Sequence, residues 1–346
     1  MKKMLIDTSF ALKNKTGVGA YIITLLNALK LVGIEPQNRE LKLPNKFKFR
    51  FIFHVLWLNT LYYFETNFRN PDFIIQPGFI MPFLTNRKTK YITVIHDLAH
   101  LRTKEMPAYN RFIFDFSTKI AIKKADILVT VSETVKQELL IQYDIPIDKI
   151  KVVYNSIGQH FINAQINNNI IEKYDLEPKK YILSVATLNK RKNIPELIKA
   201  FEQISNKYPD LKLVLVGGMG NEQREKLTKH PNVIFTGYIK DEELPTLYSN
   251  ALLYMYPSLY EGFGIPLIEA QYCCCPVLCS DIPVFREIGA ESVEYCEPEA
   301  EGIAKGLESL ISNTERLKEL SCLGKENVKR FSIDKIKKQV EIALNE

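Results

Sequence analysis

The chain has 346 residues, of which 46% are hydrophobic and 25% charged, a composition typical of a globular protein and not of a disordered or fibrous one. This length predicts two domains, each large enough for its own core. No apolar run reaches the roughly 18–20 residues of a membrane-spanning helix, and the six cysteines have neither disulfide-framework nor zinc spacing, so we expect a cytoplasmic protein.

The net charge of +6 is distributed unevenly along the chain. Residues 1–170 hold 23 Lys and Arg against 13 Asp and Glu, whereas the remainder holds 23 against 27. This asymmetry indicates that the first half faces an anionic partner: a membrane surface, a lipid diphosphate or nucleic acid. The alternative interpretation is that these basic residues only solvate the surface of that half.

Apolar runs alternate with amphipathic stretches through the first half of the chain, as in a parallel α/β sheet. The start, Met4–Asp7, is interpreted as a first strand and not as a signal sequence. Ser132 is a candidate N-cap. Strands are expected at 4–7, 73–76, 91–95, 127–131 and 151–153, and helices at 19–32, 50–66, 108–124 and 133–142.

Residues 46–63 form a basic and strongly aromatic segment. One interpretation is an element that enters the interface of the membrane and recruits anionic lipid. The other is a core helix with a basic beginning and with Trp57 directed inward. The sequence leaves both open.

Residues 163–169 are polar and aperiodic and are expected to be a linker, after which the strand–helix pattern restarts. We therefore predict domains at 1–162 and 163–332, with a terminal helix, 333–346, that packs back on the first. The fold class is α/β: two Rossmann-like, doubly wound parallel-sheet domains facing a central cleft. Strands are expected at 181–185, 212–216, 233–235, 252–256 and 277–279, and helices at 194–207, 221–229, 241–249, 265–272, 298–312 and 315–329.

The most informative segment is Tyr260–Ala270, which contains Glu261 and Glu269 eight positions apart. Glu261 precedes a Gly-Phe-Gly turn (Gly262, Phe263 and Gly264), and Pro266 marks the beginning of a helix that contains Glu269. Backbone amides at the turn and at the helix N-terminus can approach an anion. Two carboxylates with donor amides between them suit a ligand that carries both hydroxyls and phosphate, such as a sugar nucleotide.

This segment resembles the E-x7-E signature of GT4-type retaining glycosyltransferases (glycosyl transferases group 1), which have the GT-B fold. Four further segments match the same family in the same order. The resemblance implies that Glu261 and the amides of Gly262–Gly264 bind the donor sugar and that Glu269 binds the ribose hydroxyls. At Cys274, where the family commonly has glycine, the run Cys273–Cys275 is interpreted as small buried apolar residues.

Two of the four segments lie in the first half of the chain. Gly17 and Gly19 belong to a glycine loop that opens a helix and can place backbone amides against a phosphate. His96 lies at the end of a strand, where it can hydrogen-bond a sugar hydroxyl or the departing phosphate. The resemblance implies that His96 contacts the donor sugar and that the Gly17–Gly19 loop lies near phosphate and acceptor.

The other two segments lie in the second half. Lys190, Arg191 and Lys192 follow a strand, and three adjacent cations favour a nearby anion. The resemblance places Arg191 and Lys192 on the nucleotide diphosphate, where they would neutralise charge on the leaving group. Gly217 closes a strand against which a nucleotide can lie, and Tyr238 belongs to the segment that borders the base.

The resemblance implies a retaining, metal-independent sugar transfer from a UDP-, GDP- or dTDP-linked donor to a glycan or lipid-linked acceptor, with no cofactor. Catalysis is assigned to Glu261, His96, Lys192 and Arg191. The absence of an Asp-x-Asp pair agrees with a site without metal. Surface polysaccharide or lipopolysaccharide assembly is expected, at the inner face of the cell membrane and without nucleic acid. A sugar-nucleotide epimerase and an inactive carbohydrate- or lipid-binding scaffold remain alternatives.

Overall fold

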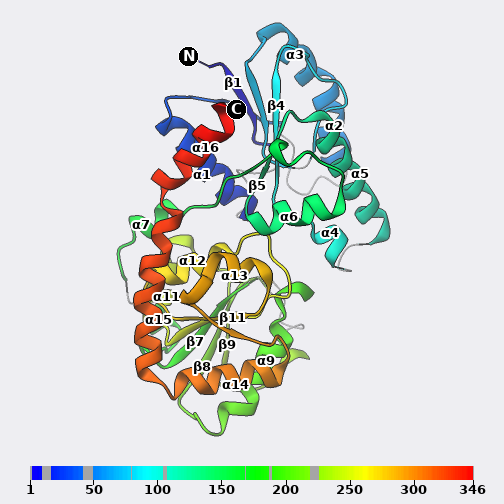
Figure 1. Cartoon of the computed structure of the whole chain (residues 1–346). Helices are drawn as coiled ribbons and strands as arrows, with labels where there is room; N and C mark the ends of the chain where they lie inside the picture. Colours follow the sequence, from blue (N-terminus) through cyan, green and yellow to red (C-terminus); the bar gives the residue numbers. More distant parts are fainter. Residues whose placement is uncertain are drawn as a thin grey trace. The chain divides into compact units, whose positions relative to one another are not determined.

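The computed structural model of the chain describes residues 2–9, 17–41, 50–78, 80–103, 107–167, 169–186, 189–218 and 226–345. Contacts divide the chain into two compact units (Figure 1). Unit 1 comprises residues 1–156 together with 333–346, and unit 2 comprises residues 157–332. The division lies six residues before the expected one, because the short helix α7 (Gln159–Ile162) belongs to unit 2.

Unit 1 is built on a six-stranded parallel sheet with the order β2-β1-β3-β4-β5-β6. Its inner strands are apolar and buried along nearly their whole length, because helices cover both faces of such a sheet. The strands are β1 (Met4–Asp7), β2 (Gln37–Arg39), β3 (Phe73–Gln76), β4 (Lys90–Ile95), β5 (Ile127–Thr130) and β6 (Ile150–Val152).

The helices of unit 1 include the last one of the chain, which packs beside the first helix of the unit (Figure 1). This contact supplies the partner that the terminal amphipathic segment lacks in the sequence. Helix α6 begins at the expected cap, where Ser132 Oγ accepts a hydrogen bond from the Val135 amide at 3.1 Å. The helices are α1 (Gly17–Leu31), α2 (Arg50–Asn59), α3 (Leu61–Arg69), α4 (Ala99–Arg102), α5 (Ala108–Lys124), α6 (Glu133–Gln142) and α16 (Ile333–Asn345).

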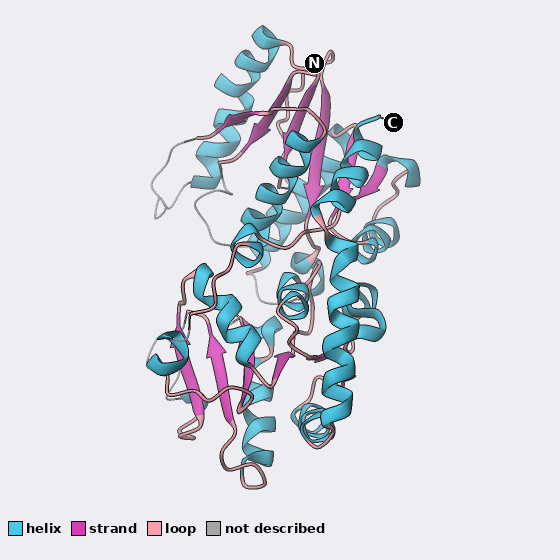
Figure 2. Ribbon diagram, turned by 90° about the vertical axis from the view of Figure 1, so that its left-hand side faces the viewer, coloured by secondary structure: helices cyan, strands magenta, loops and turns pink. Residues whose placement is uncertain are grey.

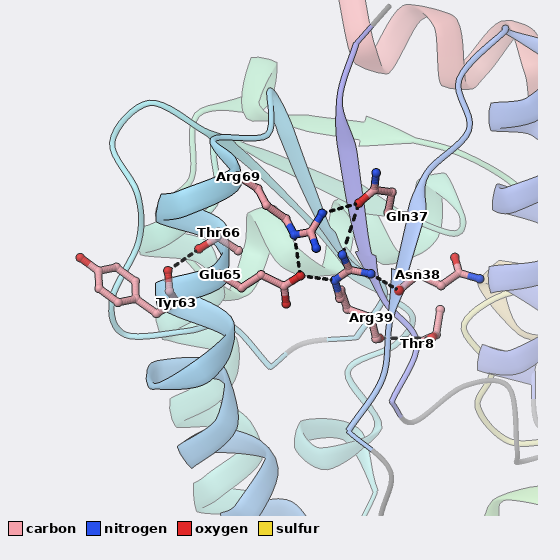
Figure 3. Close-up of polar contacts among 8 residues, drawn as sticks. All are labelled: Thr8, Gln37, Asn38, Arg39, Tyr63, Glu65, Thr66 and Arg69. Atoms are coloured by element: carbon pink, nitrogen blue, oxygen red, sulfur yellow. Dashed lines mark hydrogen bonds and ion pairs between the residues drawn. The ribbon is translucent and has the colours of Figure 1, made fainter.

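The edge strand β2 was not expected, because its sequence, Gln-Asn-Arg, is polar. It is held by its neighbours: the Thr8 amide donates to the Arg39 carbonyl at 2.8 Å, in continuation of the pairing with β1. Its side chains join helix α3 through Glu65, which receives Arg39 Nε at 2.6 Å and Arg69 Nε at 2.7 Å (Figure 3). An edge strand of this kind depends on polar contacts that periodicity does not reveal.

The single helix expected at 50–66 is wrong, since the chain forms α2 and α3 with a break at Thr60. Asn59 and Thr60 bond back to the carbonyls of Val55 and Leu56, a competition with the backbone that weakens helices. Residues 46–49 of the basic, aromatic segment 46–63 lie outside the described residues, and Trp57 is half-buried, so the membrane and core interpretations both stay predictions. Leu58 is buried, whereas other apolar side chains of α2 and α3 are exposed.

Unit 2 contains a second six-stranded parallel sheet with the order β12-β11-β10-β7-β8-β9 (Figure 2). Counted from β7 as the first strand, this is the 3-2-1-4-5-6 order of dinucleotide-binding folds. The strands are β7 (Tyr181–Val185), β8 (Lys212–Val216), β9 (Val233–Gly237), β10 (Leu253–Tyr256), β11 (Val277–Ser280) and β12 (Glu294–Cys296).

Helices α9 and α14 form one hydrophobic core with the sheet of unit 2, into which Ile182, Leu213, Leu253 and Met255 project. The helix expected at 241–249 is a 3-10 turn followed by α11. The helix expected at 221–229 lies largely outside the described residues. The helices of unit 2 that follow α7 are α8 (Asn169–Lys173), α9 (Ile194–Ser205), α11 (Leu244–Asn250), α12 (Ile265–Tyr272), α13 (Pro283–Gly289), α14 (Ala300–Ile311) and α15 (Thr314–Asn327).

The prediction that the whole cysteine run is buried is wrong for Cys274, which is exposed. Its φ of 56° places it in the left-handed region, which explains why a glycine suits this position. The Cys275 amide donates to the Ala270 carbonyl at 2.9 Å and the Cys274 amide to the Gln271 carbonyl at 3.0 Å. These two bonds form a Schellman motif that ends helix α12.

Candidate active site

The candidate site lies at the point where the strand order of unit 2 reverses. Strands β7 and β10 are hydrogen-bonded neighbours, although β8 and β9 separate them in the sequence. The segments that follow their carboxyl ends diverge to different faces of the sheet, which leaves room for ligands at that edge. The short 3-10 helix η2 (Lys190–Lys192) follows β7, and the segment 257–264 follows β10.

Two cations from the first segment meet one carboxylate from the second. Glu261 Oε1 lies 2.5 Å from Lys192 Nζ, and Glu261 Oε2 lies 2.9 Å from Arg191 Nη1. The backbone joins the same two segments, because the Leu259 amide donates to the Arg191 carbonyl at 2.7 Å. Arg191 Nη1 also donates to the Tyr260 carbonyl at 3.1 Å. The structure thus brings together three of the predicted catalytic residues.

Lys192 and Glu261 are each only 9% exposed, so their charges are largely removed from water. Burial alone raises the pKa of Glu261, but the charges of Lys192 and Arg191 and the hydrogen bond from Lys192 outweigh it. The pKa of Glu261 is therefore lowered. The carboxylate stays ionised at neutral pH, and the cluster of Arg191, Lys192 and Glu261 keeps one net positive charge.

The glycine turn leads directly into helix α12. Gly264 has a φ of 96°, and a Cβ placed there would lie 2.9 Å from Phe285 Cε1, so both conformation and space favour glycine. The Leu267 amide donates to the Gly264 carbonyl at 3.0 Å, and Pro266 occupies the first turn. Gly262 is buried, and the ring of Phe263 packs edge-on against Phe331, with the ring centres 5.5 Å apart.

Glu269 lies in a different environment from Glu261. The pKa of Glu269 is raised to about 7: burial is the main cause, a hydrogen bond from the Tyr248 hydroxyl opposes it, and the charge of Asp241 adds a smaller rise. Tyr248 Oη lies 3.3 Å from Glu269 Oε2. No ion pair is formed by Glu269 within the described part of the chain. Its carboxyl group is thus poised to accept or to donate hydrogen bonds near neutral pH.

The other predicted nucleotide contacts lie on neighbouring strands. Gly217 ends β8 with a φ of 148°, and its amide donates to the Gly237 carbonyl at 2.9 Å. Tyr238 is 61% exposed, and its hydroxyl lies 3.2 Å from Asp241 Oδ1. Residues 219–225, which follow β8, and residues 187 and 188, which follow β7, lie outside the description.

The predicted residues of unit 1 form no comparable ionic cluster. His96 follows β4, and its Nε2 donates to the Pro77 carbonyl at 2.7 Å. Burial lowers the pKa of His96 more than the Pro77 carbonyl and Asp97 raise it, so the ring is neutral at pH 7. Nδ1 then carries the free lone pair and acts as an acceptor. Gly17 and Gly19 begin helix α1, but residues 10–16 before them are not described.

A buried hydrogen-bonded pair of an aspartate and a histidine in unit 1 was missed. Asp7, the last residue of β1, lies with Oδ2 2.8 Å from Nε2 of His54 on α2, and the two side chains are nearly inaccessible. Asp7 Oδ1 accepts from the Ser9 amide at 2.9 Å, and Ser9 Oγ accepts from the Leu41 amide at 2.8 Å. The sequence places Asp7 at the end of the first expected strand, but no spacing rule connects it to a histidine 47 positions later.

In the described part of the chain, no helix is long and apolar enough to cross a membrane. Among the same residues, no group of three or more His, Cys, Asp or Glu side chains could hold a metal ion.

Two family models match the chain: "Glycosyltransferase Family 4" over residues 31–158 and "Glycosyl transferases group 1" over residues 167–327. The O-antigen chain mannosyltransferase RfbU of Salmonella typhimurium is 32% identical over 279 residues, which are 79% of this chain and 73% of RfbU. O-antigen chain mannosyltransferase B of Escherichia coli is 28% identical over 235 residues. That match covers 64% of this chain and 60% of the relative, so the chain spans less than two thirds of its length.

Two solved structures resemble the whole chain. WaaG, a glycosyltransferase involved in lipopolysaccharide biosynthesis, gives a TM-score of 0.79 at 13% identity and covers 99% of this chain and 100% of WaaG. Anabaena HepE in complex with UDP and glucose gives 0.75 at 15% identity, covering 99% of both chains. At these identities the likeness concerns the fold alone. The chain therefore belongs to the GT4-type glycosyltransferases (glycosyl transferases group 1) and has their two-domain α/β GT-B fold.

Proposed function

We propose that the chain transfers a hexosyl group from a nucleotide-sugar donor to a hydroxyl of a glycan or lipid-linked acceptor. The reaction retains the anomeric configuration and uses no metal. The cluster of Arg191, Lys192 and Glu261 at the strand-order reversal of unit 2 carries this proposal. The names of RfbU and WaaG support a role in surface polysaccharide or lipopolysaccharide assembly. The UDP in the HepE structure supports a nucleoside diphosphate as the leaving group.

Each residue has a role that follows from its charge. Arg191 and Lys192 bind the donor diphosphate and stabilise the negative charge that develops on it. The Glu261 carboxylate holds both cations in place and accepts hydrogen bonds from sugar hydroxyls, whereas the amides of Gly262–Gly264 donate hydrogen bonds to the sugar oxygens. Glu269 binds the ribose hydroxyls, and Gly217 and Tyr238 lie along the nucleotide.

In the transfer step, the acceptor oxygen forms a bond to the anomeric carbon on the face from which the diphosphate leaves. The bond between that carbon and the phosphate oxygen breaks, and its electron pair stays on the leaving diphosphate. The acceptor proton passes to the leaving phosphate oxygen, so no strong base is needed. Because the transition state resembles an oxocarbenium ion, stabilisation of the diphosphate charge is the main requirement.

The experiment that tests this function is a panel of UDP-, GDP- and dTDP-linked sugars in a thermal-shift assay, followed by transfer with NMR of the product. We expect one nucleotide class to raise the melting temperature, because selective binding stabilises the folded state. Lys192→Ala should make the shift markedly smaller, whereas Lys190→Ala, which removes an exposed lysine of the same turn, is the matched control and should leave it unchanged. A panel with no shift, or release of free nucleotide with an epimerised sugar and no acceptor product, would contradict the proposal.

We also propose that unit 1 contacts anionic membrane lipid. Helix α3 exposes Leu61 (72%), Phe64 (69%) and Phe68 (90%), and α5 exposes Tyr109 and Phe112 at the same spacing. These apolar stripes lie on the half of the chain that is rich in lysine and arginine. Together they suit a membrane, which has an apolar interior and an anionic surface.

Co-sedimentation with vesicles tests the membrane contact. We expect the protein to bind phosphatidylglycerol-containing vesicles but not pure phosphatidylcholine. The double variant Phe64→Ser/Phe68→Ser should bind several-fold less, while Ile141→Ser, which removes an exposed apolar side chain from α6, should bind as the wild type does. If the double variant instead converts a dimer into a monomer in size-exclusion chromatography, the apolar stripes bind a second copy of the chain and not lipid.

A further inference from the structure

Tyr256, the last residue of β10, lies directly beneath the ionic cluster and has no role in the mechanism above. Side chains alternate along β10: Leu253 and Met255 enter the core with α9 and α14, whereas Tyr254 and Tyr256 face the opposite side of the sheet. Tyr256 is only 1% exposed. A buried tyrosine at the end of a strand next to charged groups must satisfy its hydroxyl locally.

The hydroxyl and the ring of Tyr256 both meet Lys192. Lys192 Nζ lies 3.4 Å from Tyr256 Oη and 5.2 Å from the centre of the ring. Burial raises the pKa of Tyr256 well above its ordinary value, and the neighbouring Glu261 carboxylate raises it further. The hydroxyl therefore keeps its proton, which it can offer to Glu261 while its oxygen accepts from Lys192.

The same ring also supports the glycine turn. Tyr256 packs against Phe285 with ring centres 4.6 Å apart. A Cβ on Gly264 would lie 2.9 Å from Phe285 and 3.5 Å from Tyr256 Cε1, so the turn before α12 rests on this pair of rings. One aromatic pair thus contacts both the lysine that follows β7 and the turn that follows β10.

We propose that Tyr256 is a positioning residue of this site: its hydroxyl and ring fix the Lys192 ammonium against Glu261 and hold it in register with the Gly262–Gly264 turn. Without Tyr256, Lys192 would keep its charge but lose two of the contacts that define its direction. For a cation that must meet a diphosphate oxygen, direction matters as much as charge. The inference deepens the proposed function, on which its second test rests.

The first test needs no ligand. The rate at which acetic anhydride acetylates Lys192 is measured by peptide mass spectrometry in the wild type, Tyr256→Phe and Tyr254→Phe. We expect Tyr256→Phe to raise the reactivity of Lys192 about 3- to 10-fold, which is the expected effect of one lost hydrogen bond. Tyr254→Phe should leave it unchanged. Tyr254 is a matched control because it is equally buried, on the same face of β10 and with its ring 5.6 Å from that of Tyr256.

The second test measures binding of UDP, GDP and dTDP by calorimetry in a double-mutant cycle. Tyr256→Phe should weaken binding about 3- to 10-fold when Lys192 is present and have almost no effect when Lys192→Ala is already in place. A residue that merely supports the fold would give equal losses in both backgrounds. Melting temperatures of all variants show whether any of them is unfolded, and Tyr256→Phe keeps the ring that fills the core.

Every outcome of these two tests either supports or overturns the positioning role of Tyr256. Unchanged reactivity of Lys192 in Tyr256→Phe, or equal changes in Tyr254→Phe, overturns the inference whatever the protein binds. Equal losses of nucleotide affinity with and without Lys192 also overturn it. Raised reactivity in a protein that binds none of UDP, GDP and dTDP supports the positioning of Lys192 and contradicts the proposed function, so the two failures are distinguishable.

Discussion

The carboxyl ends of the strands in the two units differ in how their side chains are used. In unit 2, residues that follow β7 and β10 bind one another, and Glu261 receives both Arg191 and Lys192. In unit 1, His96 follows β4 and donates to the backbone at Pro77, and it carries no charge at neutral pH. The predicted site residues that follow the strands of unit 2 thus form a charged cluster, whereas the predicted site residue that follows β4 of unit 1, His96, is neutral.

This difference indicates which part of a substrate each unit can bind. A buried cluster with one net positive charge suits a diphosphate, whose charge increases as the sugar leaves. A neutral imidazole with one acceptor nitrogen suits a hydroxyl group. We therefore expect substitutions in unit 2 to affect transfer much more than those in unit 1.

The largest effect is expected from Glu261→Gln. The amide preserves the shape of the side chain but removes the charge that orients two cations, so the rate of transfer should fall by about 100-fold or more. Steady-state kinetics with the donor identified by the thermal-shift panel would measure it. Near-normal turnover in a folded Glu261→Gln protein would show that the cluster is structural, and the contrast between the units would disappear.

Gly264→Ala should have the next largest effect. Its φ of 96° and the 2.9 Å approach to Phe285 make any side chain strained, at a cost of about 1–3 kcal/mol in the free energy of unfolding. Chemical denaturation would measure this cost. Gly218→Ala is the matched control, since a Cβ at Gly218 meets no atom within 4 Å. Equal stabilities of the two variants would contradict the assigned role of the turn.

The sequence predicts the fold well where apolar periodicity is strong. Strands β7 and β8 and helices α5, α6 and α12 have the expected bounds, because their buried faces repeat regularly. The sequence does not predict short strands that contacts elsewhere in the fold hold in place. The polar strand β2 is one example, and the edge strand β12, which pairs with β11, is another. The prediction also fails at Thr60, where side-chain bonds to the backbone divide a long apolar stretch into α2 and α3.

The sequence predicts the individual residues of the candidate site but not which of them contact one another. The motif around Glu261 and the cations after β7 each indicate a site, yet only the strand order brings them within 2.5 Å of each other. Tyr256 carries a weak signal, the aromatic alternation Tyr254-Met255-Tyr256, which does not reveal which lysine it meets. The pair of Asp7 and His54 has no signal in the sequence.

The two carboxylates of the motif should respond to pH with opposite signs. In the folded chain the pKa of Glu269 rises from 4.5 to about 7, so the folded state is fully favoured below 4.5 and loses stability as the pH rises to 7. Glu269→Gln should remove this loss and gain on the order of 1–3 kcal/mol relative to the wild type between pH 5 and pH 8. Chemical denaturation at several pH values would measure the gain.

Glu261 provides the internal control for this experiment. Its pKa is lowered in the folded state, so its contribution is present above 4.5 and disappears as the pH falls below that value. Glu261→Gln should therefore be less stable than the wild type at pH 7 and approach it in acid. If both variants shift stability in the same direction, the two carboxylates do not have the different environments described.

The smallest effect is expected in unit 1, from two substitutions that separate the nitrogens of His96. His96→Gln can keep the hydrogen bond to the Pro77 carbonyl but loses the acceptor at Nδ1, and His96→Asn does the reverse. If Nδ1 accepts a hydrogen bond from a substrate hydroxyl, His96→Gln should slow transfer only about 3- to 10-fold while the melting temperature is kept. His96→Asn should have the opposite effect: the melting temperature falls, and the rate of transfer stays near that of the wild type. Because burial lowers the pKa of His96, the pH–rate profile of the wild type should show no ionisation of this ring above neutral pH. The profiles of the two variants should therefore have the same shape in that range. A loss from His96→Gln as large as that from Glu261→Gln would show that unit 1 also stabilises charge in the transition state.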